Sequence, residues 1–173
     1  MTLFVILEGQ KGAGKTFIAK KLKEQLEAKN LLVTYFDEES IINECLNNKT
    51  LRMYDLYGLR EHEYLSLLET SDVILIEKSF ITNVVYHLGD VPDQMITDFI
   101  EYELGHYFTD TTSCQIYVLF RTYEDLNVDM FLGVAHYLLE TYNIDISCLP
   151  NSQDDMTENL LQHIMTRIEL EID

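Results

Sequence analysis

The stretch GQKGAGKT at residues 9–16 is the feature that most constrains how this chain can fold. It matches the pattern G-x-x-x-x-G-K-[ST], a glycine-rich turn whose backbone N–H groups surround an anion. The apolar run TLFVIL at residues 2–7 precedes the turn, and a segment with Ile18, Leu22 and Leu26 at helical spacing follows it. A buried strand, this turn and an amphipathic helix, in that order, predict a phosphate-binding unit. The structural alternative is a strand–helix turn that holds no ligand.

The residue types of this turn have separate expected tasks. Gly12 and Gly14 let the backbone approach phosphate oxygens closely. Lys15 is expected to reach the β- and γ-phosphates of ATP, and the hydroxyl of Thr16 is expected to ligate Mg²⁺. The predicted nucleotide-binding residues of the turn are Gly9, Gly12, Ala13, Gly14, Lys15 and Thr16.

Apolar runs alternate with helical patterns along the rest of the chain. Further strands are predicted at residues 31–36, 72–77, 115–120 and 144–147. The first helix is predicted to stop at Asn30. Later helices are predicted within residues 38–70, within 79–108, and around Met130, Val134, Leu138 and Tyr142. After a loop at 148–155, a last helix is predicted from Asp154 or Asp155 onward. Because the strands are apolar throughout, both faces of a parallel sheet are expected to be covered, which indicates one α/β domain spanning residues 1–173.

The charge distribution narrows the class of partner. The formal net charge is −18, which disfavours nucleic acid or anionic lipid as a main partner. Six of the twelve lysines and arginines nevertheless lie between Lys11 and Lys29, around the glycine-rich turn, where they suit a small anion. The apolar runs are shorter than the roughly 18 residues that span a membrane. We therefore expect a cytoplasmic protein with a small-molecule nucleotide substrate.

Three segments, in chain order, resemble the thymidylate kinase family of P-loop nucleotide kinases. They are FVILEGQKGAGKT, the block LYGLREHEYLSLLETSDVILIEKSFITNVVYHLG at residues 56–89, and QIYVLF followed by a helix. The resemblance implies a three-layer P-loop NTPase fold with strand order 2-3-1-4-5. It also implies transfer of a phosphoryl group from ATP, with Mg²⁺, to a dTMP-like pyrimidine deoxynucleoside monophosphate. Family members are often homodimers, which apolar residues within 79–108 would permit.

The resemblance also assigns roles to an acid–base pair at the end of the third predicted strand. Glu77 takes the place of the family's aspartate and would hold the shell of the magnesium ion. Lys78 takes the place of an arginine that contacts the acceptor phosphate. An acid that ends an apolar strand at the carboxyl edge of an α/β sheet lies where such sheets bind ligands. The structural alternative for Lys78 is a simple strand-end residue.

Five further residues would form the acceptor pocket in the same resemblance. Arg60 falls where the family places an arginine against the base, and Leu56 or Tyr57 would form an apolar wall for the ring. Asn83 and Tyr86 lie at the spacing at which some members read the pyrimidine edge and pack the sugar. Each has a structural alternative: a surface ion pair for Arg60, helix surface for Asn83 and core for Tyr86.

Two departures from the family pattern concern positive charge. Lys11 stands where the family usually has an aspartate, and no lysine or arginine lies between Arg121 and Arg167, where the family has its arginine-bearing lid. Lys11 is therefore a candidate catalytic cation, together with Lys15 and Lys78. Arg121 is a candidate to flank the base of the donor nucleotide.

Two other functions stay open at this point. Asp37 follows the second predicted strand, where related deoxynucleoside kinases place a general base for a sugar hydroxyl. A monophosphate acceptor needs no such base, because it is already an anionic nucleophile. The missing lid leaves a third alternative, a catalytically degenerate module that binds nucleotide without turnover.

Overall fold

The computed structural model describes residues 1–36, 66–121, 126–151 and 154–172. Five parallel strands form one sheet: β1 (Thr2–Gly9), β2 (Val33–Phe36), β3 (Val73–Glu77), β4 (Thr112–Phe120) and β5 (Ile146–Pro150). Their order is β2-β3-β1-β4-β5, which confirms the predicted sheet. The strand that leads into the glycine-rich turn, β1, is therefore central, with β3 on one side and β4 on the other.

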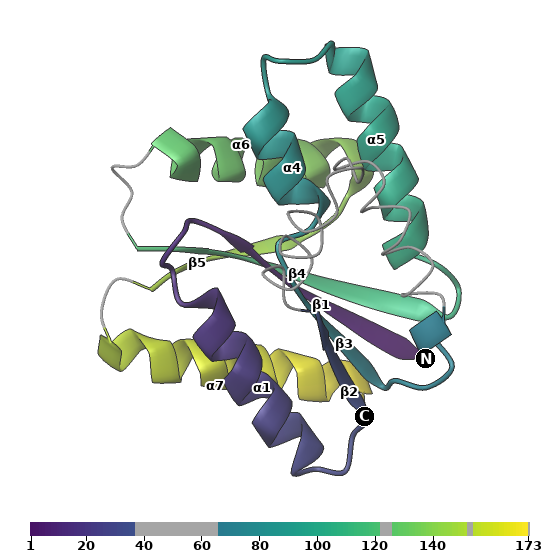
Figure 1. Cartoon of the computed structure of the whole chain (residues 1–173), viewed down its shortest axis with the longest axis vertical. Coiled ribbons are helices and arrows are strands. Elements are labelled where there is room, and N and C mark those ends of the chain that lie inside the picture. The colour runs from purple at the N-terminus through teal and green to yellow at the C-terminus, as the bar shows by residue number, and fades with distance from the viewer. Residues whose placement is uncertain (37–65, 122–125, 152–153, 173) are drawn as a thin grey trace, which may run out of the picture.

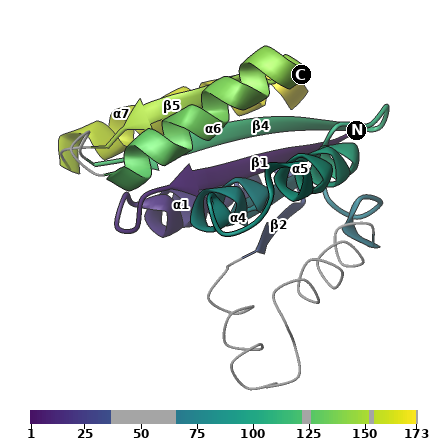
Figure 2. The same cartoon turned by 90° about the horizontal axis from the view of Figure 1, so that it is seen from above.

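Helices cover both faces of the sheet, in three layers (Figures 1 and 2). One face is covered by α1 (Lys15–Glu27) and α7 (Asp154–Ile172), and the other by α4 (Phe80–His87), α5 (Asp93–Tyr107) and α6 (Leu126–Tyr142). Alternate residues of β1 enter the two cores: Leu3, Val5 and Leu7 pack with α1 and α7, and Phe4 and Ile6 pack on the opposite side. This double burial explains why β1 is apolar without alternation.

Several predicted boundaries were wrong by a few residues; the fourth strand, for example, begins at Thr112 rather than at residue 115. The second strand begins at Val33 rather than at residue 31. It is half-buried rather than buried, because among the described strands it lies at the edge of the sheet and pairs with β3 alone. The fifth strand starts two residues late, at Ile146, and continues through Pro150 into the stretch predicted as a loop. The first helix ends at Glu27, and Asn30 adopts a left-handed conformation (φ 65°) in the turn that follows.

The sheet brings together three segments that are distant in sequence. The glycine-rich turn follows β1, Lys78 follows β3 and Arg121 follows β4. Because neighbouring parallel strands end at the same edge, these three segments lie side by side at the carboxyl edge of the sheet (Figure 1). Within the ranges that the structure describes, no helix is both long and apolar enough to cross a bilayer.

Candidate functional site

The glycine-rich turn is fastened at its start to the neighbouring strand. Gly9 has a φ of 112°, and a Cβ atom there would lie 2.1 Å from the carbonyl oxygen of Leu119. The next residue, Gln10, donates its backbone N–H to that same carbonyl at 3.1 Å. Only glycine fits this close approach of two main chains, so the turn leaves β1 in a single direction.

The other end of the turn is the N-terminus of α1. Gly14 is the N-cap, with a φ of 88°, and it provides no side-chain hydrogen bond to the helix; the first turn of α1 contains no acidic residue. Backbone N–H groups and the helix dipole make such a terminus favourable for an anion. The geometry therefore suits phosphate oxygens at the position that a capping side chain takes in other helices.

Lys15 carries a buried positive charge within this turn. The residue is only 6% exposed. Its Nζ donates hydrogen bonds to the carbonyl oxygens of Gly9 at 2.8 Å and of Gln10 at 2.7 Å. The ammonium group is therefore held inside the curve of the turn. A phosphate chain bound along the turn would meet this charge together with the N-terminus of α1.

Thr16 and Glu77 form a pair between α1 and β3. The Thr16 hydroxyl donates to Glu77 Oε2 at 3.1 Å, and the Tyr35 hydroxyl of β2 donates to Glu77 Oε1 at 2.9 Å. Hydroxyl and carboxylate oxygens are the ligands that Mg²⁺ prefers. The structure thus brings together the two predicted metal ligands, and their chemistry fits a magnesium ion. Tyr35 was not predicted; only the pairing of β2 with β3 places it beside Glu77.

Lys78 follows Glu77 in a left-handed conformation, with a φ of 55°. Its backbone N–H donates to the carbonyl oxygen of Leu7 at 2.9 Å, which anchors it beside the strand that carries the glycine-rich turn. A lysine in this region of conformational space costs on the order of 1 kcal/mol. Such backbone conformations are frequent at functional sites, where surrounding contacts hold them in place.

Glu8 is a site-proximal acid that the sequence interpretation missed. It is fully buried at the end of β1, and Ser79 donates to its Oε1 from both the backbone N–H (2.5 Å) and the hydroxyl (2.6 Å). The Thr82 N–H donates to the same oxygen at 3.4 Å, and the Thr82 hydroxyl bonds Oε2. Burial raises the pKa of Glu8, and these hydrogen bonds oppose the rise. The sequence signal that could have identified Glu8 is an acidic residue at the end of an otherwise apolar strand.

The predicted acceptor residues are only partly within the described structure. Asn83 lies on α4, and its amide donates to the carbonyl oxygen of Ser79 at 3.0 Å, within the first turn of the same helix. Tyr86 lies on α4, three residues further along. The remaining predicted pocket residues lie outside the described residues: Asp37, Leu56, Tyr57 and Arg60.

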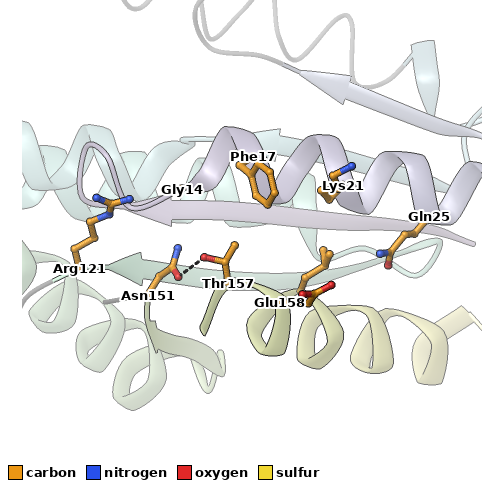
Figure 3. A pocket seen from close by; sticks show the side chains of 9 residues that line it. Gly14, Phe17, Lys21, Gln25, Arg121, Asn151, Thr157 and Glu158 are labelled. Carbon is orange, nitrogen blue, oxygen red and sulfur yellow. Dashed lines mark hydrogen bonds between the residues drawn. The ribbon is translucent and has the colours of Figure 1, made fainter. Parts of the chain in front are cut away.

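A groove of about 610 Å³ lies beside the turn, between α1 and α7 (Figure 3). Phe17 and Lys21 line it from α1, Glu158 lines it from α7, and Arg121 lies at its end. The backbone N–H of Arg121 donates to the side chain of Gln10 at 3.0 Å, so the end of β4 is tied to the turn. Arg121 therefore lies at the border of the turn and the groove, and its role beside the base of the donor nucleotide stays a prediction.

Asn151 connects the turn to the opposite wall of this groove and was also missed. Its amide donates to the carbonyl oxygen of Ala13 at 2.8 Å and accepts from the Thr157 hydroxyl of α7 at 2.9 Å. Its backbone N–H donates to Phe120 at 2.7 Å. A Cβ atom on Gly14 would lie 2.8 Å from the Asn151 amide nitrogen, so glycine at the N-cap also makes room for this contact.

Lys11 and two thiols are further reactive side chains among the described residues. Lys11 is exposed on the turn. Cys114 and Cys148 are free thiols, and burial raises the pKa of both, while Cys45 lies outside the described residues. Among the residues that the structure describes, no three histidine, cysteine, aspartate or glutamate side chains are grouped as metal ligands.

Comparison with known proteins identifies the fold. No family model and no curated protein matches the sequence. Many solved structures match, and two of them match nearly the whole chain: YorR from Bacillus subtilis, described in complex with phosphorylated GDP, and APE1195. YorR has 16% identity and a TM-score of 0.54, covering 97% of this chain and 96% of its own. APE1195 has 14% identity and a TM-score of 0.58, covering 99% and 97%. The likeness shows a five-stranded parallel α/β fold of the P-loop type.

Proposed function

We propose that this chain is a P-loop phosphotransferase that moves the γ-phosphoryl group of ATP to a pyrimidine deoxynucleoside monophosphate. The observation that carries the proposal is the turn at residues 9–16. Three features meet at this turn: the N-terminus of α1, which has no capping side chain, the ammonium group of Lys15, which is held inside the turn, and the Thr16–Glu77 pair. These features together suit the phosphate chain of a nucleoside triphosphate with magnesium.

The donor nucleotide would extend from the turn into the groove between α1 and α7. The turn and the groove share Gly14, and Arg121 borders both. An aromatic side chain, Phe17, and an arginine are suitable neighbours for a planar base. The nucleotide in the description of YorR supports a nucleotide ligand for the same architecture.

Phosphoryl transfer requires positioning and charge stabilisation more than covalent chemistry by the protein. An oxygen of the acceptor monophosphate attacks the γ-phosphorus, the bond to the β,γ-bridging oxygen breaks, and ADP leaves. Lys15 and the N-terminus of α1 stabilise negative charge on the donor. Lys78, which follows β3 beside the turn, is the candidate to neutralise the acceptor phosphate, and Lys11 is a further candidate cation. Thr16 and Glu77 would hold magnesium, which supplies charge neutralisation when bound.

The acceptor assignment rests on the order of Arg60, Lys78, Asn83 and Tyr86 along the sequence. The position of Asp37 after β2 favours a second candidate, a nucleoside kinase in which this acid is the general base. The absence of lysine and arginine between residues 121 and 167 favours the third, nucleotide binding without turnover.

One experiment separates the three. Purified protein is incubated with ATP and magnesium against dTMP, dUMP and thymidine, each in a separate reaction, and ADP is measured. We expect ADP formation that depends on dTMP or dUMP. Formation that depends on thymidine instead would replace the proposal with the nucleoside kinase. ATP binding by calorimetry without ADP in any reaction would support the binding module, and no ATP binding would reject the nucleotide site altogether.

A further inference from the structure

A second strand–helix junction lies beside the glycine-rich turn, and an acid from β1 is built into it. This junction joins β3 to α4 and consists of Lys78 and Ser79. Ser79 is the N-cap of α4, but its hydroxyl makes no capping bond to its own helix. The hydroxyl donates instead to Glu8, which also accepts the backbone N–H groups of Ser79 and Thr82. Glu8 therefore supplies the cap of α4 from another strand.

The contacts of Glu8 converge on one short segment. Its two carboxyl oxygens have four hydrogen bonds, two from backbone N–H groups and two with hydroxyl groups, all at Ser79 and Thr82. Glu8, Ser79 and Thr82 are all buried. A buried N–H group that loses its acceptor is costly, so this carboxyl group determines where the first turn of α4 can lie.

The same segment is also held through Lys78. Its N–H donates to Leu7, the residue before Glu8, and its φ of 55° turns the chain from β3 into α4. Leu7 and Glu8 thus hold Lys78 and Ser79 through consecutive contacts. Gly9, where the phosphate-binding turn starts, comes next in β1. One tripeptide of β1 therefore sets the position of both junctions.

We propose that Glu8 is a positioning residue that fixes Lys78 and the first turn of α4 relative to the phosphate-binding turn. Its carboxyl oxygens bond Ser79 and Thr82, in the segment that directly follows Lys78, so its effect on the reaction would pass through the position of Lys78. The kinetic part of this inference rests on the proposed function, whereas the structural part does not.

The test uses Glu8→Met, which keeps the chain length of the side chain and removes both acceptor oxygens. Glu103→Met is the matched control, because Glu103 is a buried acid on α5, a helix without predicted site residues. Amide hydrogen exchange measured by NMR provides the structural readout. In Glu8→Met we expect the amides of Ser79 and Thr82 to exchange at least about tenfold faster, beyond any change in the amides of β1. An equal change in α4 and β1 would overturn the inference.

A kinetic cycle with Lys78→Ala provides the second readout. If Glu8 acts through Lys78, Glu8→Met lowers kcat/KM for the acceptor by about tenfold in the wild-type background but by less than about threefold in Lys78→Ala. Glu8→Gln, which retains one acceptor oxygen, should fall between wild type and Glu8→Met. Equal effects of Glu8→Met in both backgrounds would reject the route through Lys78.

Failure of the two proposals can be told apart. A wild-type protein without acceptor-dependent ADP formation rejects the kinase, and hydrogen exchange still decides the role of Glu8. If Glu8→Met does not fold, Thr82→Val removes one hydroxyl from the same contact, with Thr97→Val on α5 as its control. Faster exchange at Ser79 in Thr82→Val alone supports the inference, and identical exchange in both variants overturns it.

Discussion

Two strand–helix junctions lie side by side at the carboxyl edge of the sheet, and they complete the N-termini of their helices differently. At the β3–α4 junction, the protein supplies a carboxyl group of its own, Glu8. At the β1–α1 junction, the N-cap is Gly14, without a capping side chain, and the first turn of α1 has no acid. Both helices present the same backbone donors. The junction without an internal acid is therefore the one suited to a ligand anion.

The two junctions also differ in how they accommodate left-handed backbone. The turn after β1 uses glycine at its positive φ angles, at residues 9, 12 and 14, whereas the turn after β3 uses Lys78. Glycine adopts this conformation without strain, but it carries no side chain. A lysine in this conformation has a strained backbone, but its side chain places a positive charge at the edge of the sheet. The first junction thus offers backbone donors to an anion, and the second offers a side chain.

The largest effect is expected when the β1–α1 junction loses its cation. Lys15→Ala should lower the rate of ADP formation by about 10³-fold, because the charge held inside the turn is lost. Steady-state kinetics with ATP and the acceptor found in the panel measures this effect. Lys20→Ala, which removes an exposed lysine of the same helix, is the control and should change the rate by less than about twofold. Equal rates for Lys15→Ala and wild type would contradict the conclusion that the β1–α1 junction is the one that binds a ligand anion.

A second effect concerns the close approach of β1 to β4. Gly9→Ala should lower the free energy of unfolding by about 3 kcal/mol, because the added Cβ would meet the Leu119 carbonyl and the main chain must move. Gly12→Ala is the matched control: its Cβ would meet no atom within 4 Å, so we expect about 1 kcal/mol from its φ of 80° alone. Urea unfolding compares the two, and equal losses would contradict the fastening of the turn to β4.

A smaller effect tests the pair that joins the two junctions, Thr16 and Glu77. Tyr35→Phe removes the hydroxyl that donates to Glu77 while keeping the ring. We expect the magnesium concentration for half-maximal activity to rise by about tenfold, since residues that orient a metal ligand typically have effects of this size. Tyr137→Phe, on the exposed surface of α6, should leave the magnesium requirement unchanged. A change of similar size in both variants would assign the effect to general perturbation.

The smallest effect in stability should come from making the second junction resemble the first. Lys78→Gly relieves the strain of the left-handed backbone but raises the conformational entropy of the unfolded chain. Because these two effects oppose each other, we expect the free energy of unfolding to change by less than about 1 kcal/mol. Acceptor-dependent activity should fall because the cation is lost. Urea unfolding and steady-state kinetics on one preparation compare the two properties. A large loss of stability would show that the side chain of Lys78, rather than its backbone, holds the junction.

Local patterns were sufficient for the parts of this molecule that depend on neighbours in sequence. The turn at residues 9–16 and the apolar strands around it have the expected structure, and the resemblance to P-loop kinases led to the right strand order. The fifth strand was placed too early because its half-buried residues, Ile146–Pro150, give a weak pattern and include a proline. Proline is tolerated there because β5 is an edge strand, which only the sheet reveals.

The hydrogen-bond partners of the site required the tertiary structure. Glu8 and Ser79 are 71 residues apart, and Asn151 is 138 residues from Ala13. Neither separation has a periodicity that a sequence pattern can detect. Glu77 was recognised because an acid ending an apolar strand needs a partner, and the same argument applied to Glu8 would have singled it out.

By itself, the sequence determined that this chain forms a glycine-rich turn between a buried strand and a helix, because glycine positions and apolar periodicity act over a few residues. Only the tertiary structure decided which groups complete the two junctions: Glu8 at α4, Asn151 beside the turn and Tyr35 at Glu77. The physical reason is that buried polar groups are satisfied by whichever donors and acceptors the packed strands bring within hydrogen-bonding distance. Which donors and acceptors come within this distance depends on the order of the strands in the sheet, and not on the position of the residues along the chain.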